Sequence, residues 1–131
     1  MPQSGTTFLG NHEFDDGVGN LSAFTNAITN NYPMLACNIN VSRVPELKNL
    51  IKPYILKTFN GETVAIVGYV TPETKELSDT GDTIFIDEIS SLRQTVAKLK
   101  SQGVKIIVAV GHSGYTKDKE IAKKVQFCLT Q

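Results

Sequence analysis

A short polar segment near the start of the chain carries side chains that could take part in phosphate chemistry. Asn11, His12 and Asp15 follow Gly10 closely, directly after the apolar pair Phe8-Leu9. An Asn carbonyl oxygen suits a hard divalent cation, and an Asp beside a His can hold the imidazole oriented and charged. The segment therefore indicates metal-assisted chemistry on a phosphate group.

The sequence contains two histidines, His12 and His112, and the second lies in a Gly-His-Ser-Gly segment. A centre that holds two metal ions normally needs more ligands than two histidines and one asparagine. We therefore expect His112 to contribute to the same site and the ligand set of this chain to be incomplete.

Hydrophobic patterns predict strands that alternate with helices. Short runs rich in Val, Ile and Leu indicate the strands, and apolar residues three or four positions apart indicate the helices. The predicted strands are 6–9, 34–39, 53–59, 63–70 and 104–110, and the predicted helices are 21–28, 88–101 and 118–127. This order is typical of a layered α/β domain, with one domain over residues 1–131.

Local signals define several of these elements more closely. Asn60-Gly61 predicts a hairpin between two strands, because both residues tolerate positive φ. The continuous apolar run Val64–Val67 predicts a strand that is covered on both faces. Asp87 is a candidate N-cap for the helix 88–101, and Gly103 is its predicted stop.

Both histidines follow the carboxyl end of a predicted strand, 6–9 for His12 and 104–110 for His112. In open α/β sheets such ends gather at one edge, where ligands bind. We therefore expect Asn11 and His112 to lie close together in the folded chain.

The composition excludes some classes of partner. Thirteen basic and thirteen acidic residues cancel, so the charge balance favours neither nucleic acid nor an anionic membrane. No apolar run approaches the ~20 residues of a membrane-spanning helix, and residues 1–5 do not resemble a signal peptide. Cys37 and Cys128 could pair or stay free, and the oligomeric state is open.

Four blocks in this order resemble the 5′-nucleotidase/apyrase family of calcineurin-like metallophosphoesterases. Gly10–Asp15 is similar to the family's Gly-Asn-His-Glu block, and Asp16-Gly17 extends the match. The further blocks are Ala36–Ile39, Ile66–Thr74 and Gly111–Tyr115. The resemblance runs from about Leu9 to Val125 and implies part of a metallophosphoesterase-type α/β domain.

The resemblance implies a role for each of four residues. Asn11 and His112 would bind divalent metal ions, zinc first, with manganese, magnesium or calcium as alternatives. His12 would act as an imidazolium that stabilises charge on the phosphoryl oxygens, and Asp15 would orient it as a buried carboxylate and raise its pKa. The family's reaction is attack of a metal-activated hydroxide on a nucleotide phosphate of AMP, ADP or ATP.

The sequence also departs from the family pattern. The family's site uses an Asp-x-His pair and a Gly-Asp carboxylate upstream of the Asn-His-Glu block, but residues 1–10 contain neither Asp nor His. Gly81-Asp82 lies downstream and is interpreted as a turn, and residues 127–131 leave the pattern. We also expect this chain to lack the N-terminal strands and the C-terminal substrate domain that the resemblance implies. We therefore expect an incomplete metal site and exposed sheet edges.

Each of these residues has a simpler interpretation as well. His12 and His112 could be ordinary loop histidines, although the four blocks together favour functional roles. Glu13 is interpreted as structural or solvated, and Asp16 as a turn residue. Ser113 does not lie in a Gly-x-Ser-x-Gly elbow, which argues against a serine nucleophile.

The leading hypothesis is a segment or truncated form of a metal-dependent 5′-nucleotidase or apyrase, inactive alone. The alternatives are a non-catalytic nucleotide- or protein-binding form that lost its metals, and a piece of a longer enzyme. The resemblance implies an extracellular or cell-surface parent protein, and Asn20 and Asn40 begin N-x-Ser sequons compatible with it.

Overall fold

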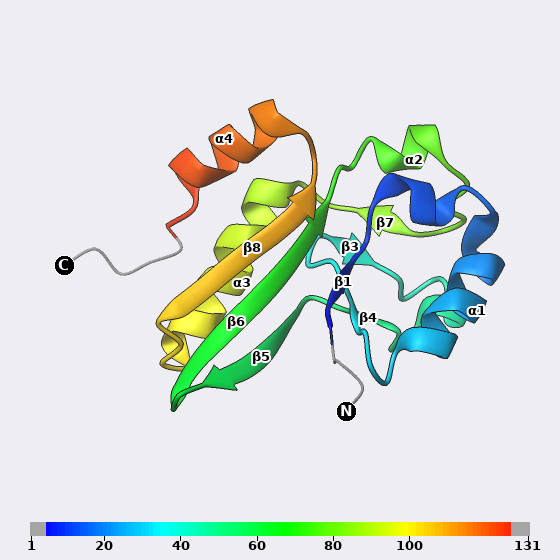
Figure 1. Cartoon of the computed structure of the whole chain (residues 1–131). Coiled ribbons are helices and arrows are strands. Elements are labelled where there is room, and N and C mark those ends of the chain that lie inside the picture. Colours follow the sequence, from blue (N-terminus) through cyan, green and yellow to red (C-terminus); the bar gives the residue numbers. More distant parts are fainter. Residues whose placement is uncertain (1–4, 127–131) are drawn as a thin grey trace.

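The structure is a computed structural model that describes residues 5–126. Its strands are β1 (Thr7–Phe8), β2 (Met34–Leu35), β3 (Ile39–Asn40), β4 (Ile51–Lys52), β5 (Tyr54–Phe59), β6 (Glu62–Val70), β7 (Ile84–Phe85) and β8 (Ile106–His112). Its helices are α1 (Gly17–Ile28), α2 (Thr74–Leu77), α3 (Glu88–Ser101) and α4 (Tyr115–Lys124), with 3-10 turns η1 (Asn11–Phe14) and η2 (Pro45–Leu47). The expected α/β class is confirmed (Figure 1).

The largest sheet has the order β5-β6-β8. β5 and β6 form the predicted hairpin, and its turn residues Asn60 and Gly61 have φ angles of 49° and 82°. β6 runs parallel to β8 in a register that ends with Val70 opposite His112. Figure 1 shows that β1, β6 and β8 end on the same side of the molecule.

A second, parallel sheet has the order β1-β2-β4, and it meets β6 at Gly68. A Cβ on Gly68 would overlap the backbone carbonyl of Leu35, so only glycine lets the two segments approach this closely. The amide N–H of Cys37 then donates to the Gly68 carbonyl at 2.7 Å. β1 of this second sheet also contacts β8.

The predicted strand 34–39 is wrong in part, because the chain leaves one sheet and enters another within it. Met34–Leu35 belongs to the parallel sheet, whereas Ile39–Asn40 pairs antiparallel with β7. The change occurs at Asn38, whose buried side chain accepts a hydrogen bond from the Val70 amide and donates to the Val70 and Ile86 carbonyls.

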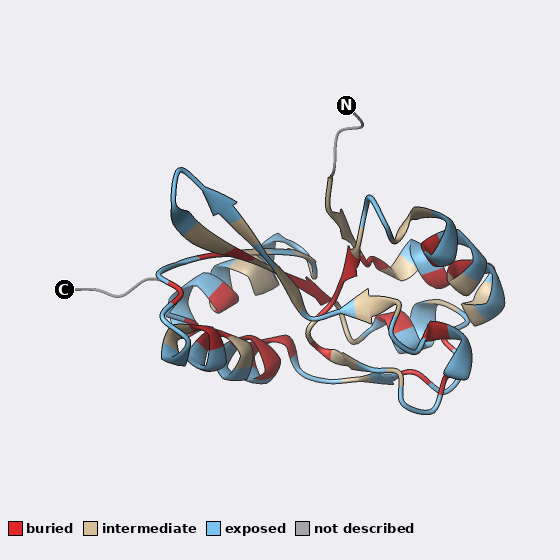
Figure 2. Ribbon diagram, turned by 90° about the horizontal axis from the view of Figure 1, so that it is seen from below, coloured by how far each residue is buried: buried red, intermediate tan, exposed pale blue. Residues whose placement is uncertain are grey.

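α3 follows its prediction closely and covers one face of the large sheet. Asp87 caps it by accepting a hydrogen bond from the Ser90 amide at 2.9 Å, and Gly103 follows its end with a φ of 85°. The buried residues between α3, α4 and the sheet are Ala65, Val67, Tyr69, Ile89, Leu92, Val96, Leu99, Val104, Ile107, Ile121 and Val125. Figure 2 shows the buried side of α3 toward the sheet and its exposed side outward.

The opposite face of this sheet is apolar but open to solvent, so the prediction that Val64–Val67 is covered on both faces is wrong. Ala65 and Val67 are buried, whereas Val64 and Ile66 are only half-buried. Their neighbours Ile106 and Val108 on β8 are 42% and 45% exposed. The reason is that α3 and α4 lie on a single face of the sheet, and β8 pairs with β6 alone among residues 5–126.

A second core cluster lies beside α1. Its buried members are Leu9, Phe14, Leu21, Met34, Ala36, Val44, Leu47 and Val70. α1 begins at Gly17 rather than at Leu21, with Asp16 at the N-cap position and Gly17 at a φ of 85°. The cluster fixes the start of the chain against β2 and β6.

Three predicted strands, 6–9, 53–59 and 63–70, differ from the structure by one residue at one or both ends, and two further elements differ by two or three residues. α4 spans 115–124 instead of 118–127, and residue 127 lies outside the described part of the chain. β8 spans 106–112 instead of 104–110, so that His112 is the last residue of the strand rather than a loop residue after it. The added strand pairing fixes the backbone of His112.

Candidate functional site

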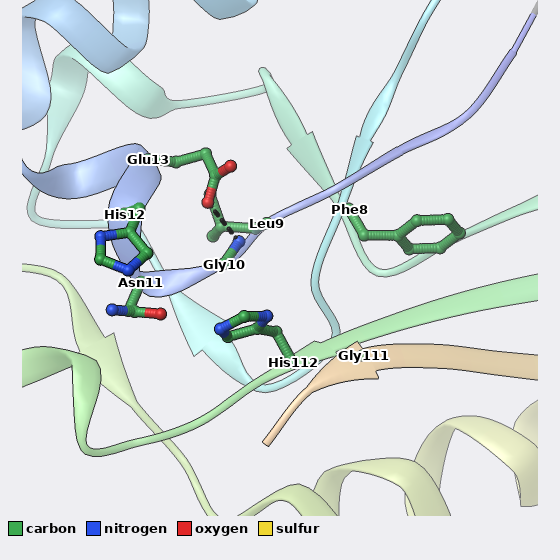
Figure 3. Close-up of a pocket in the computed structure, with 8 residues that line it drawn as sticks. All are labelled: Phe8, Leu9, Gly10, Asn11, His12, Glu13, Gly111 and His112. Carbon is green, nitrogen blue, oxygen red and sulfur yellow. Dashed lines mark hydrogen bonds between the residues drawn. The ribbon is translucent and has the colours of Figure 1, made fainter. Parts of the chain in front are cut away.

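One pocket brings together the two parts of the chain that the sequence analysis singled out. It lies where β1 and β8 end, and its volume is about 190 Å³. The residues that line it are Phe8, Leu9, Gly10, Asn11, His12, Glu13, Gly111 and His112 (Figure 3). The expectation that Asn11 and His112 lie close together is confirmed. This volume is below that of typical drug-sized ligand sites.

Gly10 lies close to the side chains of both His112 and Glu13. A Cβ on Gly10 would lie 3.5 Å from Cγ of His112 and 2.8 Å from Oε2 of Glu13. The Glu13 carboxylate accepts a hydrogen bond from the Gly10 amide at 2.7 Å and thereby closes the η1 turn. This contact agrees with a structural interpretation of Glu13.

Backbone contacts of β8 determine where His112 lies. The carbonyl of His112 accepts a hydrogen bond from the amide of Thr71 at 3.0 Å, just beyond the end of β6. At the preceding position, a Cβ on Gly111 would overlap the ring of Tyr69. The ring of Tyr69 thus fills the space beside Gly111, and its hydroxyl donates to Asp118 on α4 at 2.7 Å.

His12, which lines the pocket, forms a hydrogen-bonded pair with Asp15. Nδ1 of His12 lies 2.8 Å from Oδ2 of Asp15 across the η1 turn. This hydrogen bond, with the charge of Asp15, raises the pKa of His12 above its ordinary value of 6.5. The pKa of Asp15 is lowered, first by His12 and then by the hydrogen bond from Ser78.

The expectation of a buried carboxylate is wrong. The side chain of Asp15 is 49% exposed and that of His12 is 78% exposed, because the η1 turn lies on the surface. Water therefore screens the pair, and its attraction is weaker than that of a buried pair.

Ser78 contacts this pair, although no signal in the sequence analysis pointed to it. Its hydroxyl lies 2.8 Å from Oδ1 of Asp15 and 2.9 Å from the carbonyl oxygen of Asn11. A serine after a short helix has no distinctive spacing. Its contact with a turn more than 60 positions earlier follows only from the fold.

The metal ligands that the resemblance implies are present only in part. Asn11 and His112 offer an amide oxygen and an imidazole nitrogen to the same pocket. Residues 5–126 contain no group of three or more His, Cys, Asp or Glu side chains placed to bind a metal ion. Two neutral donors alone do not fit a dimetal centre.

The remaining candidates have structural positions. Asp16 is the N-cap residue of α1, and Gly81-Asp82 lies in a turn, as expected. The Ser113 hydroxyl is buried and has no hydrogen-bond partner among the described residues. Burial raises the pKa of the Cys37 thiol to about 11, and Cys128 lies outside residues 5–126.

Within residues 5–126, none of the helices has the length and apolar character needed to span a bilayer.

Comparison with known proteins gives close relatives by sequence, although no protein-family model matches the chain. The chain is 43% identical over 119 residues to Protein 5NUC of Lutzomyia longipalpis. It is 42% identical over 123 residues to the 5′-nucleotidase of Rattus norvegicus. The alignments cover 88% and 90% of this chain but only 20% and 21% of those proteins.

Solved structures agree with the sequence comparison. The 5′-nucleotidase precursor of Thermus thermophilus matches with a TM-score of 0.88 at 36% identity, over 94% of this chain and 24% of its own. The NAD nucleotidase of Haemophilus influenzae has a TM-score of 0.84 at 36% identity, over 24% of its length. A calcineurin-like phosphoesterase of Bacillus subtilis, at 24% identity and a TM-score of 0.65, shares the fold.

Sequence and fold therefore agree that the chain belongs to the 5′-nucleotidase family, as a segment that spans about a fifth of the length of its curated relatives.

Proposed function

We propose that this chain is a segment of a metal-dependent 5′-nucleotidase or apyrase and contributes one part of its phosphate site. The observation that carries the proposal is one pocket that residues of the Asn11–Phe14 turn and His112 line together. The family relationship supports a hydrolase of nucleotides, with AMP, ADP or ATP as the substrate. Nucleic acid is not a proposed partner, because the net charge is zero.

In this proposal His12 is the residue that meets the transferred phosphoryl group. Its ring is 78% exposed at the pocket rim, and its raised pKa favours the imidazolium form. A cation there would stabilise negative charge that develops on the phosphoryl oxygens. Asp15 would keep the ring oriented through the contact with Nδ1, which leaves Nε2 free to face the substrate.

Asn11 and His112 are the proposed ligands of a divalent metal ion, with zinc first and manganese, magnesium or calcium as alternatives. Such an ion supplies Lewis-acid chemistry when it is bound. Because residues 5–126 provide no cluster of three ionisable ligands, other parts of a parent protein would have to complete the centre. We therefore propose that the 131-residue chain does not turn over nucleotides by itself.

A direct assay tests this proposal. The purified chain is incubated with AMP, ADP or ATP and with each candidate metal ion, and phosphate release is measured. No release above background is expected. Release that depends on metal and disappears in His12→Ala would contradict the proposed inactivity.

The proposed ligands are tested separately by calorimetry with zinc. His112→Ala should weaken any zinc binding, whereas Asp15→Asn should leave it unchanged. The reverse pattern would make Asp15 a ligand and contradict the roles proposed for both residues.

A second candidate is a non-catalytic form that binds nucleotide or protein without metal. The lack of an ionisable ligand cluster in residues 5–126 favours it. Binding of AMP in the presence of a chelator would support this form. Binding that requires metal would favour the enzyme segment.

The parent protein is proposed to act outside the cell or at its surface. Relatives include snake venom 5′-nucleotidases, which are 40% identical over 123 residues. Localisation of a tagged parent protein, with glycosidase treatment to detect sugars at Asn20 and Asn40, tests this point.

A further inference from the structure

The carboxylate of Asp15 is held at both of its oxygens. Oδ2 lies 2.8 Å from Nδ1 of His12, and Oδ1 accepts a hydrogen bond from the Ser78 hydroxyl at 2.8 Å. A carboxylate bound at one oxygen can still rotate, but bonds at both oxygens oppose that rotation. Ser78 therefore affects how well Asp15 can orient the imidazole.

The same hydroxyl also lies against the main chain of the turn. It is 2.9 Å from the carbonyl oxygen of Asn11, the first residue of η1. A hydroxyl has one hydrogen, so the two acceptors share it or alternate. In either case Ser78 contacts both the beginning of the turn and the side chain just after its end.

Ser78 is itself held in place by hydrogen bonds within residues 71–78, a segment that begins next to His112. Thr71 donates its amide N–H to the carbonyl of His112 at 3.0 Å. The fully buried Thr74 donates its hydroxyl to the Thr71 carbonyl at 2.6 Å. The backbone carbonyl of Thr74 accepts a hydrogen bond from the amide of Ser78 at 3.0 Å. Residues 71–78 thus connect the backbone of His112 to the carboxylate of Asp15.

The residues after Ser78 lie against the beginning of α1. A Cβ on Gly17 would lie 3.3 Å from Oδ2 of Asp79, and one on Gly81 would lie 3.3 Å from Cγ1 of Val18. Ser78 thus contacts Asn11 before Asp15, and residues 79–81 lie against Gly17 and Val18 after it.

We propose that Ser78 is a positioning residue for the His12–Asp15 pair, and that residues 71–78 set the distance between this pair and His112. The positioning itself rests on geometry, whereas its value for catalysis rests on the proposed function. Ser78 does not face the pocket, so its effect passes through Asp15.

The test uses NMR on the 131-residue chain, with three-bond couplings that report the χ1 rotamer of Asp15. We expect one dominant rotamer in the wild type. Ser78→Ala should lower the ratio of the main rotamer to the others by about fivefold, as for loss of a hydrogen bond to a charged group at a partly exposed site. Ser78→Thr should restore it, because Ser78 has an extended backbone with φ −144° that a β-branched residue adopts readily.

Ser90 provides the matched control, since its hydroxyl also donates to an aspartate, Asp87, at 3.1 Å. Ser90→Ala should leave the rotamer of Asp15 unchanged. If Ser78→Ala does not fold, Ser78→Cys replaces it, because a thiol has a similar size but is a weak donor.

A single Asp15 rotamer in Ser78→Ala or in a folded Ser78→Cys would overturn the proposal. If the χ1 rotamers of Asp15 were averaged to the same extent in Ser78→Ala and Ser78→Thr, the proposal would also be overturned. The Ser78 hydroxyl would then not be what holds the Asp15 rotamer. In a full-length protein that contains this segment, Ser78→Ala should lower kcat more than it changes KM. If that protein hydrolyses no nucleotide while the couplings behave as expected, the proposed function fails and the positioning role stands.

Discussion

The ring of Tyr69 occupies the space that a side chain on Gly111 would need. The two residues are opposite each other in the parallel register of β6 and β8. Tyr69 is 5% exposed, and its hydroxyl donates to Asp118, so the ring cannot move without breaking that bond. The glycine before His112 is therefore a packing requirement at the edge of the pocket.

Gly111→Ala should destabilise the chain by about 1–3 kcal/mol, because the added methyl group meets a buried ring rather than open space. Urea denaturation measures this change. Gly19→Ala is the control, since Gly19 lies in α1 with no atom within 4 Å of an added Cβ. That variant should stabilise the chain by about 0.5–1 kcal/mol. A stable Gly111→Ala would mean that Tyr69 can adopt another position.

Asn38→Ala should cost about 2–4 kcal/mol, because it leaves the buried amide and carbonyl of Val70 and the partly buried carbonyl of Ile86 without their partner. Asn38 is fully buried, so water cannot replace the lost bonds easily. The free energy of unfolding is again the measurement. Asn26→Ala on the exposed side of α1 is the control and should change stability by less than about 0.5 kcal/mol. Equal effects of the two changes would contradict a central role for Asn38.

The open face of the large sheet should bind a hydrophobic dye. Val108 is 45% exposed, between Ile106 and Val110 on the same face of β8, and such apolar surfaces bind ANS. Val108→Lys should lower the dye fluorescence and change stability by less than about 1 kcal/mol, since the side chain points to solvent. Gln94→Lys on the exposed side of α3 adds the same charge and should leave the fluorescence unchanged. Unchanged fluorescence in Val108→Lys would place the dye elsewhere.

Much of the fold could be predicted from local patterns. The hairpin at Asn60-Gly61 and the helix α3 were predicted correctly because turn chemistry and helical spacing are local properties. The division of 34–39 between two sheets could not be predicted, because it depends on Asn38 contacts with residues more than 30 positions away. The open face of Val64–Val67 was missed, since an apolar run does not show whether another layer covers it.

The candidate site, like the fold, could be predicted only in part from local sequence patterns. Strand ends indicated that Asn11 and His112 lie close together, and they line one pocket. The exposure of Asp15 and the contact of Ser78 were not foreseen, because they depend on how the η1 turn meets the segment after α2. The sequence motif identified the candidate site residues, but the contact of Ser78 with Asp15 comes from a distant part of the chain.

His12 should titrate with a pKa above 6.5, and Asp15→Asn should lower it toward that value. The cause is the hydrogen bond from Nδ1 to Oδ2 of Asp15, followed by the charge of that carboxylate. NMR titration of the imidazole signals measures the pKa of His12 in the wild type and in Asp15→Asn. Asp16→Asn is the control, because it removes the same charge one residue further along the chain, at the N-cap of α1.

The same pair predicts how stability depends on pH. A raised pKa in the folded state contributes stability that is fully present below the unfolded pKa, about 6.5, and is lost as the pH rises through the higher folded value. The lowered pKa of Asp15 contributes stability above about 3.8 that is lost as the pH falls through its folded value. Asp15→Asn should therefore destabilise the chain more at about pH 5.5 than at about pH 9. An equal cost at both values would show that the two side chains do not interact in solution.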